Sequence, residues 1–194
     1  MKSLIYILAV CSVIQLSLTQ VLDGGACKTN IPTVKNFDPA RYLGRWYENQ
    51  KYPFIFELGG KCIYAEYALM ANGDISVYNF NINQLTGKPN DIKGSAKIVD
   101  NAKLKVRFSS MPAFIGAADY WILDTDYDNY AVVYSCTDIG GLVNGKVVWI
   151  LTRERHPQPQ YIERARSVIK QNGLSLGPLH KTDQSGCEKS PGYK

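Results

Sequence analysis

Cysteines are the residues of this 194-residue chain with the most readily interpreted chemistry. Cys11 lies in an apolar N-terminal stretch, whereas Cys27, Cys62, Cys136 and Cys187 are spread over the rest of the sequence. Their spacings are long and include no C-x-x-C, which disfavours a zinc site or a thioredoxin-like centre. In an exported chain, four such cysteines predict two disulfides, which can pair in three ways.

Groups that could serve in catalysis are few. The two histidines are His156, which precedes a proline, and His180, in the C-terminal tail, and both are expected to be exposed. Asp124, Asp126 and Asp128 lie two residues apart at a predicted turn, which favours turn residues over an acid/base pair. The sequence has no G-x-S-x-G, H-E-x-x-H, phosphate-binding glycine loop or dinucleotide motif. We therefore predict a protein that is not an enzyme, needs no cofactor and holds no metal.

The composition and charge of the chain limit which classes of partner are expected. Hydrophobic residues make up 45% of the chain and charged residues 20%, which is typical of a folded globular domain. The net charge is +5, from 22 Lys and Arg against 17 Asp and Glu. Basic residues alternate with acids, as in residues 153–155, and form no block, so a nucleic-acid partner is not expected.

The N-terminus has the pattern of a secretory signal peptide. Lys2 precedes an apolar stretch, residues 4–18, that is shorter than a membrane span and ends in small residues. A cut after Thr19 fits best, and cuts after Ser17 or Gln20 also fit. We expect residues 1–19 to be removed and residues 20–194 to form one secreted, extracellular domain. The alternative is a membrane anchor.

Eight short strands are predicted after the signal peptide. The alternation is clearest where Ile75 and Val77 share a face with Asn79, and turn residues such as Asn72-Gly73 separate the strands. The predicted strands are residues 46–52, 62–69, 75–82, 92–99, 103–108, 120–123, 130–136 and 147–152. No repeat or linker divides the chain.

One amphipathic helix follows the strands. It is expected to begin near Pro159 and to end at Asn172-Gly173. Its apolar face is formed by Ile162, Ala165, Val168 and Ile169. Strands in series followed by one helix predict an all-β antiparallel barrel with the helix packed outside.

Three features occur in the order found in one known family. They are Gly44 and Trp46 within residues 36–48, the turn of Thr125, Asp126 and Tyr127, and Arg153 after the last strand. Together they resemble the lipocalins, whose fold is an eight-stranded up-and-down barrel with a C-terminal helix. The resemblance implies that Gly44 turns the chain into the barrel floor and that Trp46 closes that end. Arg153 would stack on the indole and donate to nearby carbonyl oxygens, a structural role.

Further motifs resemble two groups of lipocalins. Residues 42–48, 120–127 and 134–136 are similar to the apolipoprotein D group, and residues 60–67 to the insect bilin-binding group. The cysteine pattern shared by both groups implies the disulfides Cys27–Cys136 and Cys62–Cys187. These would tie the N-terminal arm to the seventh strand and the C-terminal tail to the second.

An eight-stranded barrel can hold one small ligand. Aromatic rings with a few neutral amides suit a flat or elongated apolar ligand with a polar end. We predict a carrier of a fatty acid, sterol, retinoid or similar lipid, bound noncovalently; the alternatives are a biliverdin-type pigment carrier and a secreted antioxidant or inhibitory protein without cargo. Some of the tyrosines could instead pack beneath the external helix. By family position, the residues that would line the cavity are Tyr67, Asn79, Asn81, Tyr120 and Trp149.

Three apolar loops should share the open end of such a barrel, namely residues 53–56, 111–115 and 139–143. Apolar tips at one rim often mark an interaction surface. We expect either that this rim docks on a membrane, lipoprotein particle or protein partner, or that the loops fold over the cavity as a lid.

Overall fold

The computed structural model describes residues 21–53, 59–112 and 116–189. The predicted signal peptide, residues 1–19, lies outside these ranges. So do residues 54–56 and 113–115, which form most of two of the predicted rim loops.

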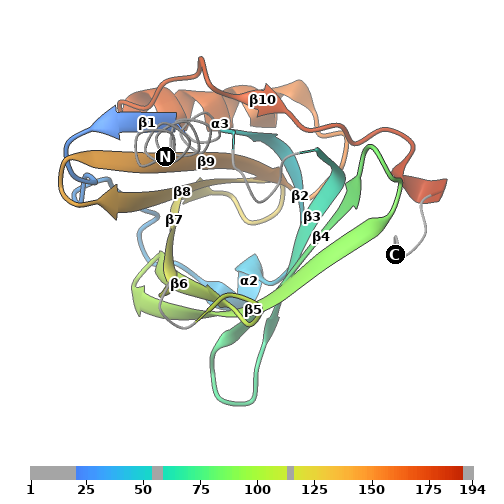
Figure 1. The fold of residues 1–194 in the computed structure, drawn as a ribbon, viewed down its shortest axis with the longest axis horizontal. Coiled ribbons are helices and arrows are strands. Elements are labelled where there is room, and N and C mark those ends of the chain that lie inside the picture. Colours follow the sequence, from blue (N-terminus) through green and yellow to red (C-terminus); the bar gives the residue numbers. More distant parts are fainter. Residues whose placement is uncertain (1–20, 54–58, 113–115, 190–194) are drawn as a thin grey trace, which may run out of the picture.

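Eight antiparallel strands form a closed barrel (Figure 1). Each strand pairs with the next along the chain, and the last pairs back with the first. The predicted fold and all eight strands are thus confirmed, most strands being longer than the sequence pattern indicated. The barrel strands are β2 (Gly44–Lys51), β3 (Gly60–Leu69), β4 (Ile75–Asn83), β5 (Pro89–Asp100), β6 (Lys103–Phe108), β7 (Ala118–Thr125), β8 (Tyr130–Ile139) and β9 (Val143–Thr152).

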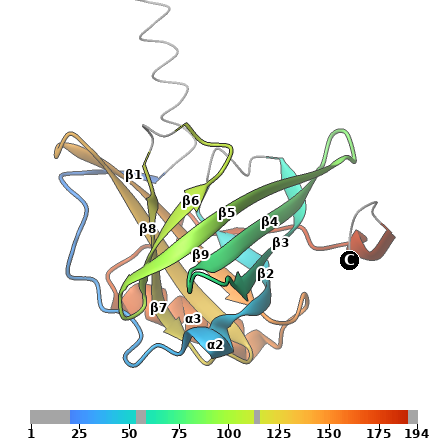
Figure 2. The ribbon, with the colours of Figure 1, turned by 90° about the horizontal axis from the view of Figure 1, so that it is seen from below.

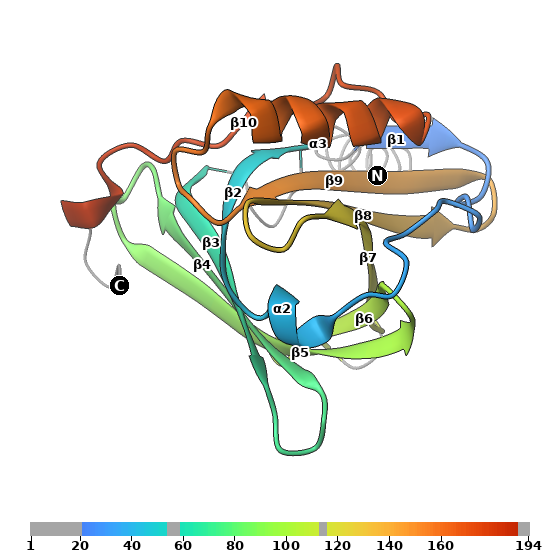
Figure 3. The ribbon, with the colours of Figure 1, turned by 180° about the vertical axis from the view of Figure 1, so that it is seen from behind.

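The predicted helix is α3 (Pro159–Gln171), which lies outside the barrel against β7 and β8 (Figure 3). Ala165, Val168 and Ile169 are buried against the outer face of the barrel, as the periodicity predicted. Gly173, with φ of 68°, follows the helix end in the left-handed region that glycine adopts without strain. Within the described ranges, no helix combines the length and apolar character needed to cross a membrane.

Four short elements were not predicted: β1 (Val21–Gly24), α2 (Pro39–Tyr42), β10 (His180–Lys181) and the 3₁₀ turn η3 (Cys187–Lys189). β1 pairs with β9 and β10 with β2. α2 lies at the end of the barrel opposite the β4–β5 and β8–β9 hairpin tips (Figure 2). Each element has two to four residues, too few for a periodic pattern to be recognisable.

Two disulfides tie the chain ends to the barrel. Cys27 and Cys136 are joined at an S–S distance of 2.03 Å, and Cys62 and Cys187 at 2.07 Å. These are the pairs that the family resemblance implied. The first holds the N-terminal arm on β8, and the second holds the C-terminal tail on β3.

The C-terminal tail also completes the barrel wall. β2 pairs with β3 only through residues 44–47, so the upper edges of the two strands are free for another segment. Residues 180–184, called the wall segment below, occupy this place. Thr182 donates its backbone N–H to the Asn49 carbonyl at 2.9 Å, and Asp183 accepts from the Cys62 N–H at 2.8 Å. The barrel wall is therefore continuous only because the tail returns to it.

Candidate ligand-binding site

The closed end of the barrel is built on Trp46, whose side chain is completely buried. The Arg153 guanidinium lies 3.8 Å from the centre of the Trp46 ring. It also donates to the carbonyl oxygens of Tyr127 at 2.9 Å, Arg45 at 2.9 Å and Arg41 at 2.8 Å. Burial lowers the pKa of Arg153 somewhat, yet an arginine stays charged at neutral pH. The stacking on Trp46 and the bonds to carbonyl oxygens are the contacts that the motif implied for Arg153.

Gly44 has the backbone conformation that its place in the motif implied. Its φ is 91°, a value that residues with a side chain rarely adopt. A Cβ atom here would lie 3.4 Å from Nη1 of Arg153, within contact distance of the floor arginine. Glycine therefore lets the chain turn into β2 close to the arginine that covers Trp46.

The turn between β7 and β8 is held by its own side chains. Thr125 accepts from the Tyr127 N–H at 2.9 Å and donates to the Tyr130 carbonyl at 2.6 Å. Asp126 accepts from the N–H groups of Asn129 at 2.8 Å and Tyr130 at 3.0 Å. Tyr127 has φ of 69°, and its ring stacks on that of Phe37 with the ring centres 6.2 Å apart. The carboxylate of Asp126 thus supports a turn, as the sequence favoured.

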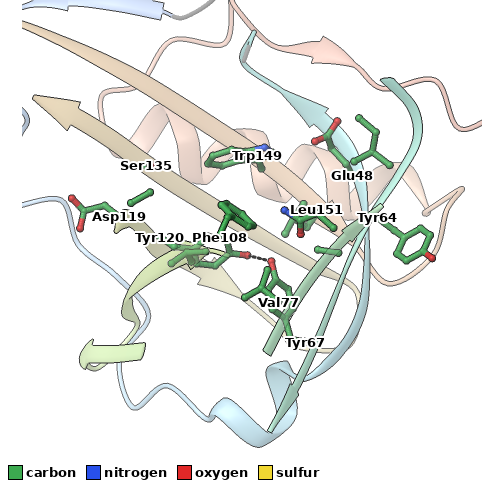
Figure 4. Close-up of a pocket in the computed structure, with 15 residues that line it drawn as sticks. Glu48, Tyr64, Tyr67, Val77, Phe108, Asp119, Tyr120, Ser135, Trp149 and Leu151 are labelled. Carbon is green, nitrogen blue, oxygen red and sulfur yellow. Dashed lines mark hydrogen bonds between the residues drawn. The ribbon is translucent and has the colours of Figure 1, made fainter. Parts of the chain in front are cut away.

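A cavity of about 110 Å³ opens between the strands above the floor (Figure 4). Its lining is mainly apolar and aromatic. The lining residues are Glu48, Ile63, Tyr64, Ala65, Tyr67, Val77, Asn79, Val106, Phe108, Ala118, Asp119, Tyr120, Ser135, Trp149 and Leu151.

Four of the predicted ligand contacts, Tyr67, Asn79, Tyr120 and Trp149, line this cavity. Asn81 does not; it lies two residues nearer the open end on the face of β4 that carries Asn79, and is half-buried. The tyrosines beneath the external helix are others, among them Tyr52, Tyr130 and Tyr134. Contact of any of these residues with a ligand stays a prediction.

Three tyrosine hydroxyls form a chain at the bottom of the cavity. Tyr120 is hydrogen-bonded to Tyr42 at 2.9 Å and to Tyr67 at 2.8 Å, the second bond being visible in Figure 4. Burial raises the pKa of both Tyr42 and Tyr120 well above the usual value, so both are neutral phenols at physiological pH. The position of Tyr42 beside the cavity could not be predicted from the sequence, because Tyr42 lies on the short helix α2, outside the alternating pattern of the strands.

The charged groups in the lining are both acids. Glu48 is buried, and its carboxylate lies 3.0 Å from the Lys51 ammonium and 2.5 Å from the Thr182 hydroxyl of the wall segment. Asp119 pairs with Lys105 at 2.8 Å. Neither acid was predicted to reach the cavity, because charged residues in strands usually mark the solvent face. No lysine or arginine is among the described residues that line it.

The other side chains considered for catalysis or metal binding do not form a group among the described residues. His156 and His180 are both exposed, as expected. Among residues 21–53, 59–112 and 116–189, no three His, Cys, Asp or Glu side chains are grouped closely enough to hold a metal ion.

One of the three predicted rim loops falls within the described residues. Residues 139–143 form the tip of the β8–β9 hairpin, where Ile139 is 54% and Leu142 79% exposed. Leu85, in the β4–β5 hairpin at the same end, is 94% exposed (Figure 2). This end of the barrel thus carries exposed aliphatic side chains on two hairpins.

Comparison with known proteins shows to which protein family the chain belongs. A family profile described as a lipocalin-like domain matches residues 37–184. Apolipoprotein D of Mus musculus is 43% identical over 159 residues, which cover 80% of this chain and 82% of that protein. The Lazarillo protein of Schistocerca americana is 34% identical over 158 residues, 78% of this chain and 72% of that protein. The chain belongs to the lipocalin family, and its resemblance to apolipoprotein D is confirmed.

Solved structures agree on the fold. Insecticyanin from the tobacco hornworm Manduca sexta superposes with a TM-score of 0.74 at 24% identity, covering 86% of this chain and 90% of that one. Lobster apocrustacyanin A1 superposes with a TM-score of 0.69 at 22% identity, covering 83% of this chain and 91% of that one.

Proposed function

We propose that this protein is a secreted carrier that binds a small hydrophobic ligand, such as a fatty acid, sterol or retinoid, noncovalently in its barrel. The observation that carries the proposal is the cavity itself, an apolar and aromatic space closed below by Trp46. The two disulfides and the signal-peptide pattern of residues 1–19 support export. The apolipoprotein D relatives support a carrier of this kind.

A catalytic role is not proposed. The buried acid Glu48 is paired with Lys51, the Asp126 carboxylate bonds to the backbone of its own turn, and Asp128 pairs with Arg41 at 2.8 Å. The protein needs no cofactor under this proposal, because holding an apolar molecule requires only a dry, shaped space.

Cavity occlusion tests the proposal directly. Ala65 lines the cavity, so Ala65→Phe should fill it, while Lys97→Phe adds the same ring at an exposed position on β5. Binding is measured by quenching of tryptophan fluorescence with arachidonate and retinol. Wild type and Lys97→Phe should bind, and Ala65→Phe should lose at least tenfold in affinity. Equal binding by all three proteins would contradict a ligand site in the barrel.

The pigment alternative has a separate test. Protein isolated from its source is examined by absorbance and by mass spectrometry of what co-purifies. Bands in the red and near the ultraviolet edge would favour a biliverdin-type cargo over a lipid. Absence of bound or bindable ligand of either kind would favour the antioxidant or inhibitory role.

Loading and release are proposed to occur with the open rim against a membrane or lipoprotein surface. The support is the exposure of Leu85, Ile139 and Leu142 on two hairpins at that end. Liposome flotation compares wild type with Leu85→Ser/Leu142→Ser and with Leu69→Ser, whose residue is exposed at the opposite end. Only the rim variant should lose flotation, and unchanged flotation of that variant would remove the docking idea.

A further inference from the structure

A group of basic side chains lies on the outer wall of the barrel, on the side opposite α3 (Figure 1, Figure 3). Successive strand residues point to opposite faces of a sheet, and the inward residues of β5 and β6 include the buried Ala96 and Leu104. The outward residues of the two strands are mostly basic, and these cations are called the basic face below. They are Lys93 and Lys97 on β5, and Lys103, Lys105 and Arg107 on β6.

Pairing of the two strands brings these cations together. Lys97 lies directly opposite Lys105, and Ser95 lies opposite Arg107, so that Lys93 is diagonal to Arg107. Directly opposed residues have Cβ atoms about 5 Å apart, and successive residues on one face of a strand are about 7 Å apart. The cations of β6 thus form a row about 14 Å long, with the lysines of β5 beside it.

Two of these cations have a partner within the protein. Lys105 pairs with Asp119 at 2.8 Å, and the Lys103 ammonium lies 4.4 Å from the centre of the Trp121 ring. Both partners belong to β7, which borders the basic face on one side. They leave the β5 side of the face without a counter-charge from that strand.

The other cations, Lys93, Lys97 and Arg107, are exposed, and no ion pair joins them to a described residue. The acids of β5 itself, Asp91 and Asp100, lie near the two ends of the strand. The centre of the basic face is therefore positively charged and open to solvent.

The opposed lysines Lys97 and Lys105 repel one another, since like charges directly opposite in a sheet are destabilising. An anion held between them would remove this repulsion. The repulsion gives the fold no advantage, so the arrangement favours a role in binding an external anion.

The row of charges suits a partner that carries several anionic groups in line. An arginine guanidinium, lysine ammonium groups and the Ser95 hydroxyl can all donate to the oxygen atoms of a sulfate group. Between Lys93 and Lys97 the face carries no exposed aliphatic side chain, unlike the rim at Leu85 and Leu142, so a lipid bilayer would gain no apolar contact there.

We propose that the basic face binds a linear sulfated polysaccharide, with Lys97 and Arg107 as its central contacts. This site lies outside the barrel and is separate from the cavity. The choice of an extracellular polyanion rests on the proposed export of the protein, whereas binding at this face does not depend on the carrier function. Such binding would hold the protein at a cell surface or in the extracellular matrix while the cavity remains accessible.

The probe is a heparin octasaccharide, compared with the same octasaccharide after chemical removal of its sulfate groups. Isothermal titration calorimetry measures both affinities at low salt and at about 0.15 M NaCl. Wild type should bind the sulfated form at least about tenfold more tightly than the desulfated form. The affinity for the sulfated form should fall as salt screens the charges.

Variants assign the binding to the basic face. Lys97→Gln/Arg107→Gln should bind the octasaccharide at least about tenfold more weakly than wild type. Lys28→Gln/Lys170→Gln removes the same charge from exposed positions on the N-terminal arm and on α3, and should bind nearly as wild type does. Urea unfolding checks that each variant is folded, and Lys97→Gln should be no less stable than wild type because it removes the opposed pair.

The outcomes separate this proposal from the others. Absence of a preference for the sulfated octasaccharide in wild type, or an equal loss in both double variants, would overturn it. Phosphatidylserine vesicles and double-stranded DNA are tested in parallel, and tighter binding of either through Lys97 and Arg107 would overturn the polysaccharide as the partner. Retinol binding, measured on the same proteins, reports on the carrier function alone and should be equal in wild type and both double variants.

Discussion

The side-chain amide of Gln184 donates a hydrogen bond to the carbonyl oxygen of Ile63 at 2.7 Å, across 121 residues of sequence. The same nitrogen donates to the carbonyl oxygen of Glu48 at 2.9 Å. Glu48 and Ile63 belong to the two strands that separate at the upper wall, and both line the cavity. One glutamine of the tail therefore joins β2 to β3 beside the ligand space.

Removing this amide should destabilise the barrel. Gln184→Leu keeps the approximate volume but leaves two buried carbonyl oxygens without this donor, for an expected loss of about 2–4 kcal/mol in the free energy of unfolding. Urea unfolding measures the loss. Gln160→Leu, at an exposed position of α3, is the matched control and should change stability by less than about 0.5 kcal/mol. A stable Gln184→Leu protein would show that the wall does not depend on this residue.

The two disulfides should differ in their effect on the cavity. Each closes a loop of more than 100 residues, so each contributes at most about 4–5 kcal/mol. Cys62→Ser/Cys187→Ser should also free the wall segment and accelerate ligand release. Cys27→Ser/Cys136→Ser should lower stability without that acceleration.

Stopped-flow release and limited proteolysis of the tail distinguish these effects. Faster cleavage near residues 181–187 is expected only without the Cys62–Cys187 bond. If both double variants release ligand equally fast, the tail has no specific role in closing the wall.

Arg153 should not be replaceable by lysine. A lysine supplies the charge, but not the flat group that stacks on Trp46 at 3.8 Å while donating to three carbonyl oxygens. Arg153→Lys should lose about 2–4 kcal/mol of stability, measured by thermal or urea unfolding. Arg107→Lys, at an exposed position of β6, is the control. Near-equal stability of the two variants would contradict the stacking role.

The free energy of unfolding should fall at high pH, because buried tyrosines such as Tyr130 ionise more readily in the unfolded chain. Burial, followed by the hydrogen bond to the Asp124 carboxylate at 2.7 Å, raises the pKa of Tyr130 to about 12. The pKa of a tyrosine in the unfolded chain is near 10. The contribution of Tyr130 to the free energy of unfolding is therefore complete below about pH 10 and is lost as the pH rises toward 12.

The Tyr130→Phe variant has no phenol hydroxyl at this position that could ionise at high pH. Between pH 9 and 11.5 it should lose about 1–2 kcal/mol less stability than wild type, as measured by urea unfolding at each pH. Identical slopes for the two proteins would show that Tyr130 titrates normally in the fold.

Local pattern and family motif account for what could be predicted. The alternation over strands such as Ile75–Asn83 and the helical spacing of Ala165, Val168 and Ile169 involve residues two to four positions apart. Such strands and helices can therefore be predicted from the sequence. The floor arrangement of Trp46 and Arg153 followed from motif order. Asn81 shows the limit, because a shared strand face does not fix how far the cavity extends along it.

The sequence by itself determined the eight strands, the helix, the cysteine set and the aromatic character of the interior, because each is encoded by residue type and short-range spacing. Only the tertiary structure decided that Gln184 closes the wall and that Tyr42 joins Tyr120 and Tyr67. Those contacts cross 53 to 136 residues and involve side chains from a short helix and an irregular tail. No local periodicity marks such residues, since their positions follow from barrel closure and from where the chain ends return.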